Sequence, residues 1–114
     1  MATSDGYTAD APGRGEVDRW PGAVVLEFGT DWCGICRAAQ PQIRDGLAGH
    51  QLKHVKIEDG PGRALGRSFR VKLWPTLIFL RDGEEVARVV RPNTVEEIHQ
   101  ALARLSAMAA PSKP

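Results

Sequence analysis

Residues 24–36 read Val-Val-Leu-Glu-Phe-Gly-Thr-Asp-Trp-Cys-Gly-Ile-Cys, and this stretch decides the fold. Its first five residues are mostly apolar, include β-branched side chains and are bounded by glycines, which is typical of a short strand. Apolar residues then recur at four-residue steps, and this spacing predicts a helix over 34–49. Cys33 therefore lies where the strand gives way to the helix, and Cys36 lies one helical turn further along.

Cys33 and Cys36 are the only cysteines of the chain, and their spacing brings the two sulfurs close enough to bridge. Unpaired N–H groups and the positive end of the helix dipole favour the thiolate of Cys33, which is the reactive form. A pair this close in sequence closes almost no loop, so it would stabilise little as a structural staple. The spacing therefore predicts a dithiol that cycles between its reduced and oxidised forms.

The rest of the chain alternates between strand-like and helix-like segments. Strands are expected at 23–28, 52–58, 76–80 and 85–90, and helices at 34–49, 61–69 and from residue 94 onward. Asp82-Gly83 predicts a hairpin turn between the last two strands, and Thr94 with Glu97 predicts a capping box on the last helix. Strands separated by helices are expected to be parallel, and the last pair antiparallel. This order predicts an α/β fold with a mixed central sheet and helices on both faces.

Length and composition indicate one domain of ordinary composition. In the chain of 114 residues we expect a domain at 15–108 between flexible tails at 1–14 and 109–114. The net charge of +1 implies neither a nucleic-acid nor a membrane partner. The first residues lack the apolar core of a signal peptide, and no stretch is long enough to span a bilayer. These features favour a cytoplasmic protein, and no feature suggests assembly beyond a monomer.

Charge is unevenly distributed along the chain. Residues 63–72 contain four basic side chains and no acidic one. A solvated helix face is the favoured interpretation of such a run, and a docking patch for an acidic partner is the alternative.

Three motifs follow one another in the sequence. The first is residues 26–37 with Pro41 five residues after the second cysteine, the second begins Trp74-Pro75-Thr76, and the third is Arg81-Asp82-Gly83-Glu84. Together they resemble the thioredoxin family over residues 22–105. The resemblance implies the thioredoxin fold, here with shortened N-terminal elements. It also implies a thiol–disulfide oxidoreductase that needs no cofactor, because the sulfurs carry the chemistry.

The catalytic roles expected within this family start from the position of each thiol. Cys33 should attack the substrate disulfide, and the deeper Cys36 should resolve the mixed disulfide after losing a proton. Burial should raise the pKa of Cys36, so an acceptor is needed. Glu27 is the candidate acceptor, because it interrupts an apolar run and thioredoxins carry a buried aspartate at the matching position. The alternatives are a Glu27 that faces solvent and, for His54, either a pair with Glu27 or simple exposure.

A substrate-binding face is also implied by the resemblance. The Trp74–Pro75 peptide bond is expected to be cis, and the backbone at position 74 is expected to pair with the substrate main chain. A trans proline that opens an edge strand is the alternative. The expected substrate-binding residues are Trp32, Gly34, Ile35, Trp74, Pro75 and Arg91.

The chain departs from the family pattern around the site. Ile35 replaces the usual proline, Gly29 stands where tryptophan is common, and Trp74 replaces a smaller β-branched residue. Arg91-Pro92 replaces a small loop that contains glycine. These departures favour a specialised member with a narrow range of partners. The resemblance itself implies disulfide-containing protein substrates and an electron donor such as a thioredoxin reductase.

Other classes of function remain open on the sequence. The fold could serve as a binding or chaperone module without turnover, or as a disulfide oxidase or isomerase, which would need an export signal. Cys33, Cys36, His50 and His54 also resemble a zinc-finger spacing. Gln40 stands where a finger needs a large apolar residue, which disfavours zinc, and we expect no metal ligand.

Overall fold

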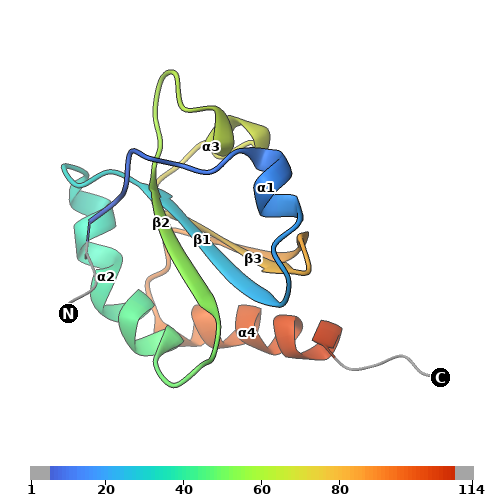
Figure 1. Cartoon of the computed structure of the whole chain (residues 1–114). Coiled ribbons are helices and arrows are strands. Elements are labelled where there is room, and N and C mark those ends of the chain that lie inside the picture. Colours follow the sequence, from blue (N-terminus) through green and yellow to red (C-terminus); the bar gives the residue numbers. More distant parts are fainter. Residues whose placement is uncertain (1–5, 110–114) are drawn as a thin grey trace, which may run out of the picture.

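The computed structural model describes residues 6–109 and places a central sheet between two layers of helices (Figure 1). The elements in chain order are α1 (Arg14–Asp18), β1 (Ala23–Gly29), α2 (Gly34–Leu47), β2 (Lys53–Glu58), α3 (Ala64–Ser68), β3 (Thr76–Arg81), β4 (Glu84–Val90) and α4 (Val95–Ala109). The four strands are ordered β2-β1-β3-β4. β1 is parallel to β2 and antiparallel to β3, and β3 and β4 form an antiparallel hairpin. The predicted mixed sheet is confirmed.

The expected parallel relation between β2 and β3 is wrong. β2 ends with Glu58 opposite Gly29, and β3 begins with Thr76 opposite Phe28. β2 therefore ends and β3 begins beside the C-terminal end of β1, and the two strands run in opposite directions. The physical reason is the length of α3. Its five residues rise only about 7 Å, whereas a strand of six residues spans roughly 20 Å. The chain therefore re-enters the sheet from the end at which it left.

The two faces of the sheet bury separate apolar clusters. On one face, Val25, Leu77 and Phe79 pack against α2 and α4, which contribute Ile43 and Ile98 among others. On the opposite face, strand residues pack against α1 and α3 (Figure 1). Because side chains alternate along a strand, Glu27 shares its face with Val25 and points toward α2. Helices on both faces are thus confirmed, and the alternation sets a carboxylate beneath the start of α2.

The N-terminal boundary predicted at residue 14 is wrong. Tyr7 is buried, and Thr8 forms a parallel bridge with Ile57 at the edge of the sheet. The Thr8 N–H donates to the Lys56 carbonyl at 2.9 Å, and the Glu58 N–H donates to the Thr8 carbonyl at 2.8 Å. Residues 6–14 are therefore ordered by backbone pairing and by one aromatic ring, and α1 already begins at Arg14. The rest of the predicted tails, residues 1–5 and 110–114, lies outside the described residues.

The last helix begins as the capping box predicts. The Glu97 N–H donates to Thr94 Oγ1 at 3.3 Å, and the Thr94 N–H donates to Glu97 Oε2 at 3.2 Å. Within residues 6–109, none of the helices has the length and apolar character that crossing a membrane requires.

Candidate active site

The two cysteines lie at the start of α2, just after the end of β1, as predicted. Cys33 is the N-cap of α2, with extended backbone, and its sulfur accepts a hydrogen bond from the Cys36 N–H at 3.2 Å. This contact and the helix dipole both favour negative charge on the Cys33 sulfur. Both cysteines are free, and only Cys33 reaches the surface, because Cys36 is fully buried. The pair therefore has one accessible and one enclosed thiol.

The enclosed thiol of Cys36 is held in its protonated form. Burial raises its pKa to about 12, and a hydrogen bond to the Cys33 side chain acts in the same direction. The backbone of Thr30 and the side chain of Tyr7 oppose this rise without cancelling it. At neutral pH Cys36 is therefore a thiol that must lose a proton before it can attack.

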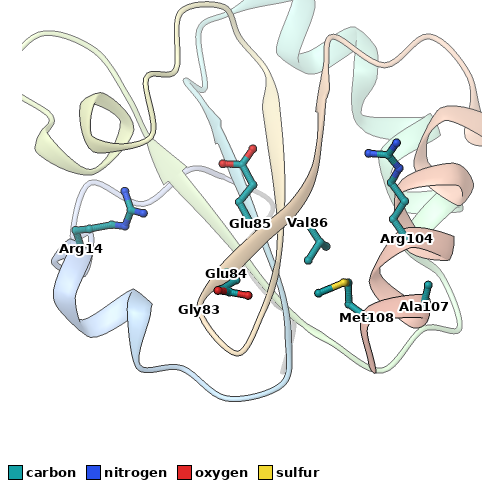
Figure 2. Close-up of a pocket in the computed structure, with 8 residues that line it drawn as sticks. All are labelled: Arg14, Gly83, Glu84, Glu85, Val86, Arg104, Ala107 and Met108. Carbon is teal, nitrogen blue, oxygen red and sulfur yellow. The ribbon is translucent and has the colours of Figure 1, made fainter. Parts of the chain in front are cut away.

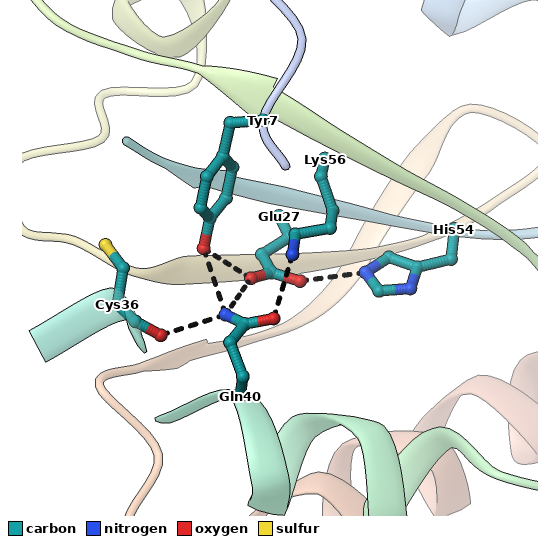
Figure 3. Close-up of polar contacts among 6 residues, drawn as sticks. All are labelled: Tyr7, Glu27, Cys36, Gln40, His54 and Lys56. Atoms are coloured by element: carbon teal, nitrogen blue, oxygen red, sulfur yellow. Dashed lines mark hydrogen bonds and ion pairs between the residues drawn. The ribbon is translucent and has the colours of Figure 1, made fainter. Parts of the chain in front are cut away.

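Glu27 lies in the middle of β1 with no solvent exposure, so the solvent-facing alternative is wrong. Its Oε1 lies 2.9 Å from His54 Nε2, and its Oε2 accepts hydrogen bonds from the Tyr7 hydroxyl at 2.5 Å and from Gln40 Nε2 at 2.9 Å (Figure 3). Burial alone would raise the pKa of Glu27, but the hydrogen bonds from His54, Gln40 and Tyr7 outweigh it and lower the pKa. Glu27 is thus an ionised, fully partnered carboxylate in the core.

β2 contributes two basic groups to the network around this carboxylate. His54 pairs with Glu27 and keeps 30% of its side chain exposed, so the pair is reached by solvent from one side. Lys56 donates from Nζ to Gln40 Oε1 at 2.9 Å and lies 4.7 Å from the centre of the Tyr7 ring. Gln40 is thereby fixed between a cation and a carboxylate, with its amide turned so that Nε2 faces Glu27.

Gly29 explains how the buried groups fit together. A Cβ built on this glycine would lie 2.8 Å from Cys36 Sγ and 2.8 Å from Tyr7 Cζ, closer than real atoms approach. The absence of a side chain at position 29 thus leaves the space that the tyrosine ring fills. This departure from the family pattern has its physical reason in Tyr7.

Two tryptophans form the outer rim beside Cys33. Trp32 is 71% exposed and meets Trp74 edge to face, with ring centres 5.8 Å apart. Trp74 Nε1 donates to Asp59 Oδ2 at 2.8 Å, which fixes its ring. The Trp74–Pro75 peptide bond is cis. Gly34 and Ile35, on the first turn of α2, are exposed as well, so the rim presents an apolar surface around the accessible sulfur.

Arg91 holds a backbone group that the substrate was expected to use. Its Nε donates to the Trp74 carbonyl at 2.8 Å, and its N–H donates to the Pro75 carbonyl at 2.9 Å. Arg91 adopts a φ of 52°, a left-handed conformation that is costly for a residue with a side chain. A strained arginine therefore covers the acceptor at position 74 in the free protein.

Sequence reasoning missed the contributions of Tyr7, Gln40, Lys56 and Asp59 to the site. Tyr7 fell in the predicted tail, although it is the only tyrosine of the chain and Gly29 signals a vacant ring position. Gln40 follows Cys36 by one helical turn, and that spacing places it on the same side of α2. No local pattern marks Asp59, whose role depends on a contact with Trp74.

The zinc-like spacing does not form a metal site among residues 6–109, where no three His, Cys, Asp or Glu side chains are grouped to hold an ion. His54 faces Glu27, and His50 lies beside His99 with ring centres 6.3 Å apart. A further hollow lies at the end of the sheet away from the cysteines, between the β3–β4 hairpin and the end of α4 (Figure 2). Its walls carry both acidic and basic side chains, which indicates no single ligand chemistry.

The comparison with protein families identifies the family of this chain. The thioredoxin family matches residues 14–104, which is most of the chain. The chain belongs to the thioredoxin family.

Similar proteins agree with this membership. Thioredoxin 2 of Pseudomonas aeruginosa PAO1, solved in its reduced form, is 52% identical with a TM-score of 0.81, covering 93% of this chain and 99% of that one. The thioredoxin of Chlamydia pneumoniae is 42% identical over 72 residues, or 60% of this chain and 69% of that protein. The thioredoxin of Listeria monocytogenes serovar 1/2a is 31% identical over 89 residues, or 76% of this chain and 86% of that protein.

The thioredoxin fold predicted from the sequence is therefore confirmed, and the protein is a thiol–disulfide oxidoreductase. Membership also implies, in general terms, disulfide-bearing protein substrates and a reductase partner.

Proposed function

We propose that this thioredoxin-family protein reduces disulfides in protein substrates, with Cys33 as nucleophile, Cys36 as resolving thiol and Glu27 as proton acceptor. The single observation that carries the proposal is the asymmetry of the pair. Cys33 is accessible at the start of a helix, whereas Cys36 is buried beside an ionised carboxylate network. An exposed nucleophile and a hidden resolving thiol suit a two-step exchange.

In the first step the Cys33 thiolate attacks one sulfur of the substrate disulfide. A bond forms between Cys33 Sγ and that sulfur, and the other substrate sulfur leaves as a thiolate that takes a proton from solvent. In the second step Cys36 attacks Cys33 Sγ, its proton passes toward Glu27, and the second substrate sulfur leaves. The substrate gains two electrons and the protein keeps a Cys33–Cys36 disulfide, so a dithiol reductant such as a thioredoxin reductase must restore it.

The substrate would dock on the apolar rim. We assign substrate binding to Trp32, Gly34, Ile35, Trp74 and Arg91, together with Pro75, which is itself buried and joined to Trp74 by the cis peptide bond. Extended substrate backbone would pair with position 74 once the Arg91 side chain gives way. The proposal places the protein in the cytoplasm as a monomer, and tagged-protein imaging and sedimentation would test these two points.

The test is reduction of insulin disulfides by the full chain, with dithiothreitol as electron source. Cys33→Ser should abolish the activity. Mixed with insulin in the absence of dithiothreitol, which would cleave the adduct, Cys36→Ser should accumulate a mixed disulfide that is visible by mass. A binding module would instead keep its partner in Cys33→Ser and show no turnover in the unchanged protein.

The reduction potential of the Cys33–Cys36 pair separates the remaining alternatives. Equilibration in glutathione buffers, read by tryptophan fluorescence, should give about −270 mV for a reductase of this type. A potential above roughly −200 mV would indicate a disulfide oxidase or isomerase instead.

A further inference from the structure

We infer that the Tyr7 hydroxyl relays the proton from Cys36 to Glu27, so that the N-terminal segment completes the catalytic machinery. This inference rests on the proposed function, because it concerns the second step of the exchange. It adds to that step a group that lies outside the strand and helix carrying the cysteines.

The position of Tyr7 between the two groups carries the argument. Its hydroxyl donates to Glu27 Oε2 at 2.5 Å and accepts from Gln40 Nε2 at 3.2 Å. The point where a Gly29 Cβ would lie is 2.9 Å from this hydroxyl and 2.8 Å from Cys36 Sγ. Only a methyl-sized volume therefore separates the hydroxyl from the sulfur. Within residues 6–109, no hydrogen bond joins the Cys36 thiol to Glu27, and Gln40 connects Glu27 only to the backbone carbonyl of Cys36. The Tyr7 hydroxyl is therefore the group placed to carry a proton from the thiol to the carboxylate.

Tyr7 is suited to pass a proton without keeping a charge. Burial, followed by the charge of Glu27, raises the pKa of Tyr7 far above its ordinary value, so the phenol stays neutral. The same side chain lowers the pKa of Cys36 against the larger effect of burial, in keeping with the short separation of the two groups across Gly29. A neutral hydroxyl that faces both a thiol and a carboxylate can accept from one while it donates to the other.

The relay acts once the mixed disulfide has formed. The Cys36 proton moves to the Tyr7 oxygen while the Tyr7 proton moves to Glu27 Oε2, so Tyr7 is neutral before and after. The Cys36 sulfur forms its bond to Cys33 Sγ, and the bond between Cys33 and the substrate sulfur breaks with its electron pair on the substrate. Glu27 ends protonated and returns its proton to solvent past the partly exposed His54.

Backbone hydrogen bonds at Tyr7 and at the following residue hold this segment against the domain. The Tyr7 N–H donates to Asp31 Oδ1 at 2.9 Å, and Thr8 pairs with the backbone of β2. Lys56 from β2 lies over one face of the ring. These contacts position the Tyr7 ring without any hydrogen bond of its hydroxyl. A phenylalanine ring can therefore occupy the same position.

The test measures the two steps separately in the full chain. Tyr7→Phe keeps the ring and removes the relay, and Thr8→Ala is the matched control, because Thr8 is anchored by its backbone and its side chain is exposed. Rapid mixing with a disulfide peptide, followed by acid quench and mass analysis, reports formation and decay of the Cys33 mixed disulfide.

We expect Tyr7→Phe to form the mixed disulfide at the rate of the unchanged protein and to resolve it more slowly, on the order of 10²-fold. The pH profile supplies a readout that a loss of packing would not move. With the relay, resolution should be nearly independent of pH between the pKa of Glu27 and that of Cys36. Without it, the rate should rise about tenfold per pH unit, because only the rare Cys36 thiolate reacts. The ionisable groups that face this site are Glu27 of β1, Cys36 of α2, His54 and Lys56 of β2, and Asp31.

A second measurement tests the relay even if Tyr7→Phe lowers the stability of the fold. In a double-mutant cycle, Tyr7→Phe should add little to Glu27→Gln, because both remove the same proton path. Unchanged resolution in Tyr7→Phe, a slower but still flat pH profile, or additive effects would each overturn the relay. The proposed function would then stand as long as the unchanged protein reduces the peptide. Failure of the unchanged protein to do so would instead reject the function itself.

Discussion

Cys33 and Cys36 lie on one turn of the same helix, yet their surroundings are opposites. The outer side, formed by Trp32, Trp74 and Arg91 around Cys33, is exposed and mostly apolar. The inner side, formed by Tyr7, Glu27, Gln40 and His54 around Cys36, is a polar network whose hydrogen bonds converge on one buried carboxylate and which opens to solvent only at its partly exposed members. The contrast separates two tasks. In the proposed function the outer side would bind the substrate, and the inner side would move the proton to a carboxylate that has no solvent exposure of its own.

The largest effect is expected when the inner side loses its charge. Glu27→Gln keeps the volume but removes the base, so resolution of the mixed disulfide should slow on the order of 10²-fold. Formation of the mixed disulfide on the outer side should be unchanged. Quenched single-turnover kinetics will check both rates, with Glu58→Gln as control because Glu58 is a partly exposed carboxylate on β2 that pairs with Arg63. Equal slowing of both steps would break the proposed separation.

The next largest effect concerns the space between Cys36 and Tyr7 on the inner side. Gly29→Ala places a methyl group 2.8 Å from both Cys36 Sγ and Tyr7 Cζ, so the ring or the helix start must shift. We expect a loss of about 1–3 kcal/mol in the free energy of unfolding, as for other overpacked cores. Urea denaturation will measure it, against Gly13→Ala, where a Cβ meets nothing within 4 Å. An equal, small effect in both variants would mean that Tyr7 does not need this vacancy.

The same contrast explains what the sequence could and could not predict. The strand, the N-capping Cys33 and the buried Cys36 follow from local spacing, because apolar periodicity and helix geometry act over a few residues. Tyr7 escaped prediction because a short polar segment has no periodicity, and its ring is fixed by contacts with residues 20 or more positions away. The direction of β3 failed for a related reason: only the brevity of α3 reveals it.

A smaller effect is expected on the outer side, where Arg91 covers the Trp74 carbonyl. Arg91→Gly removes the guanidinium and relieves a left-handed conformation that costs a non-glycine residue roughly 1–2 kcal/mol. The freed carbonyl can pair with substrate backbone, so KM for a protein disulfide should fall a few-fold while the resolving rate stays unchanged. Steady-state reduction assays will measure KM, with Arg104→Gly, a substitution on α4, as control. A rise in KM would show instead that the guanidinium contacts the substrate itself.

The smallest effect is a change in the pH dependence of stability that the inner side alone should show. The folded protein lowers the pKa of Glu27, so its ionisation stabilises the fold above the unfolded pKa of about 4.3, and this contribution is lost as the pH falls through the folded value. His54 provides the strongest of the interactions that lower this pKa. In His54→Gln the folded pKa of Glu27 should rise, and acid unfolding should therefore begin at higher pH than in the unchanged protein. Urea unfolding between pH 3 and pH 8 will measure the shift. Lys53→Gln is the matched control, because Lys53 lies on the same strand but faces the Trp20 ring instead of Glu27. The difference in stability at neutral pH should be below about 1 kcal/mol, since His54 is partly exposed and solvent screens the pair.

If His54→Gln and Lys53→Gln unfold at the same pH, the hydrogen bonds from Tyr7 and Gln40 are sufficient to keep Glu27 ionised, and His54 serves only as its route to solvent.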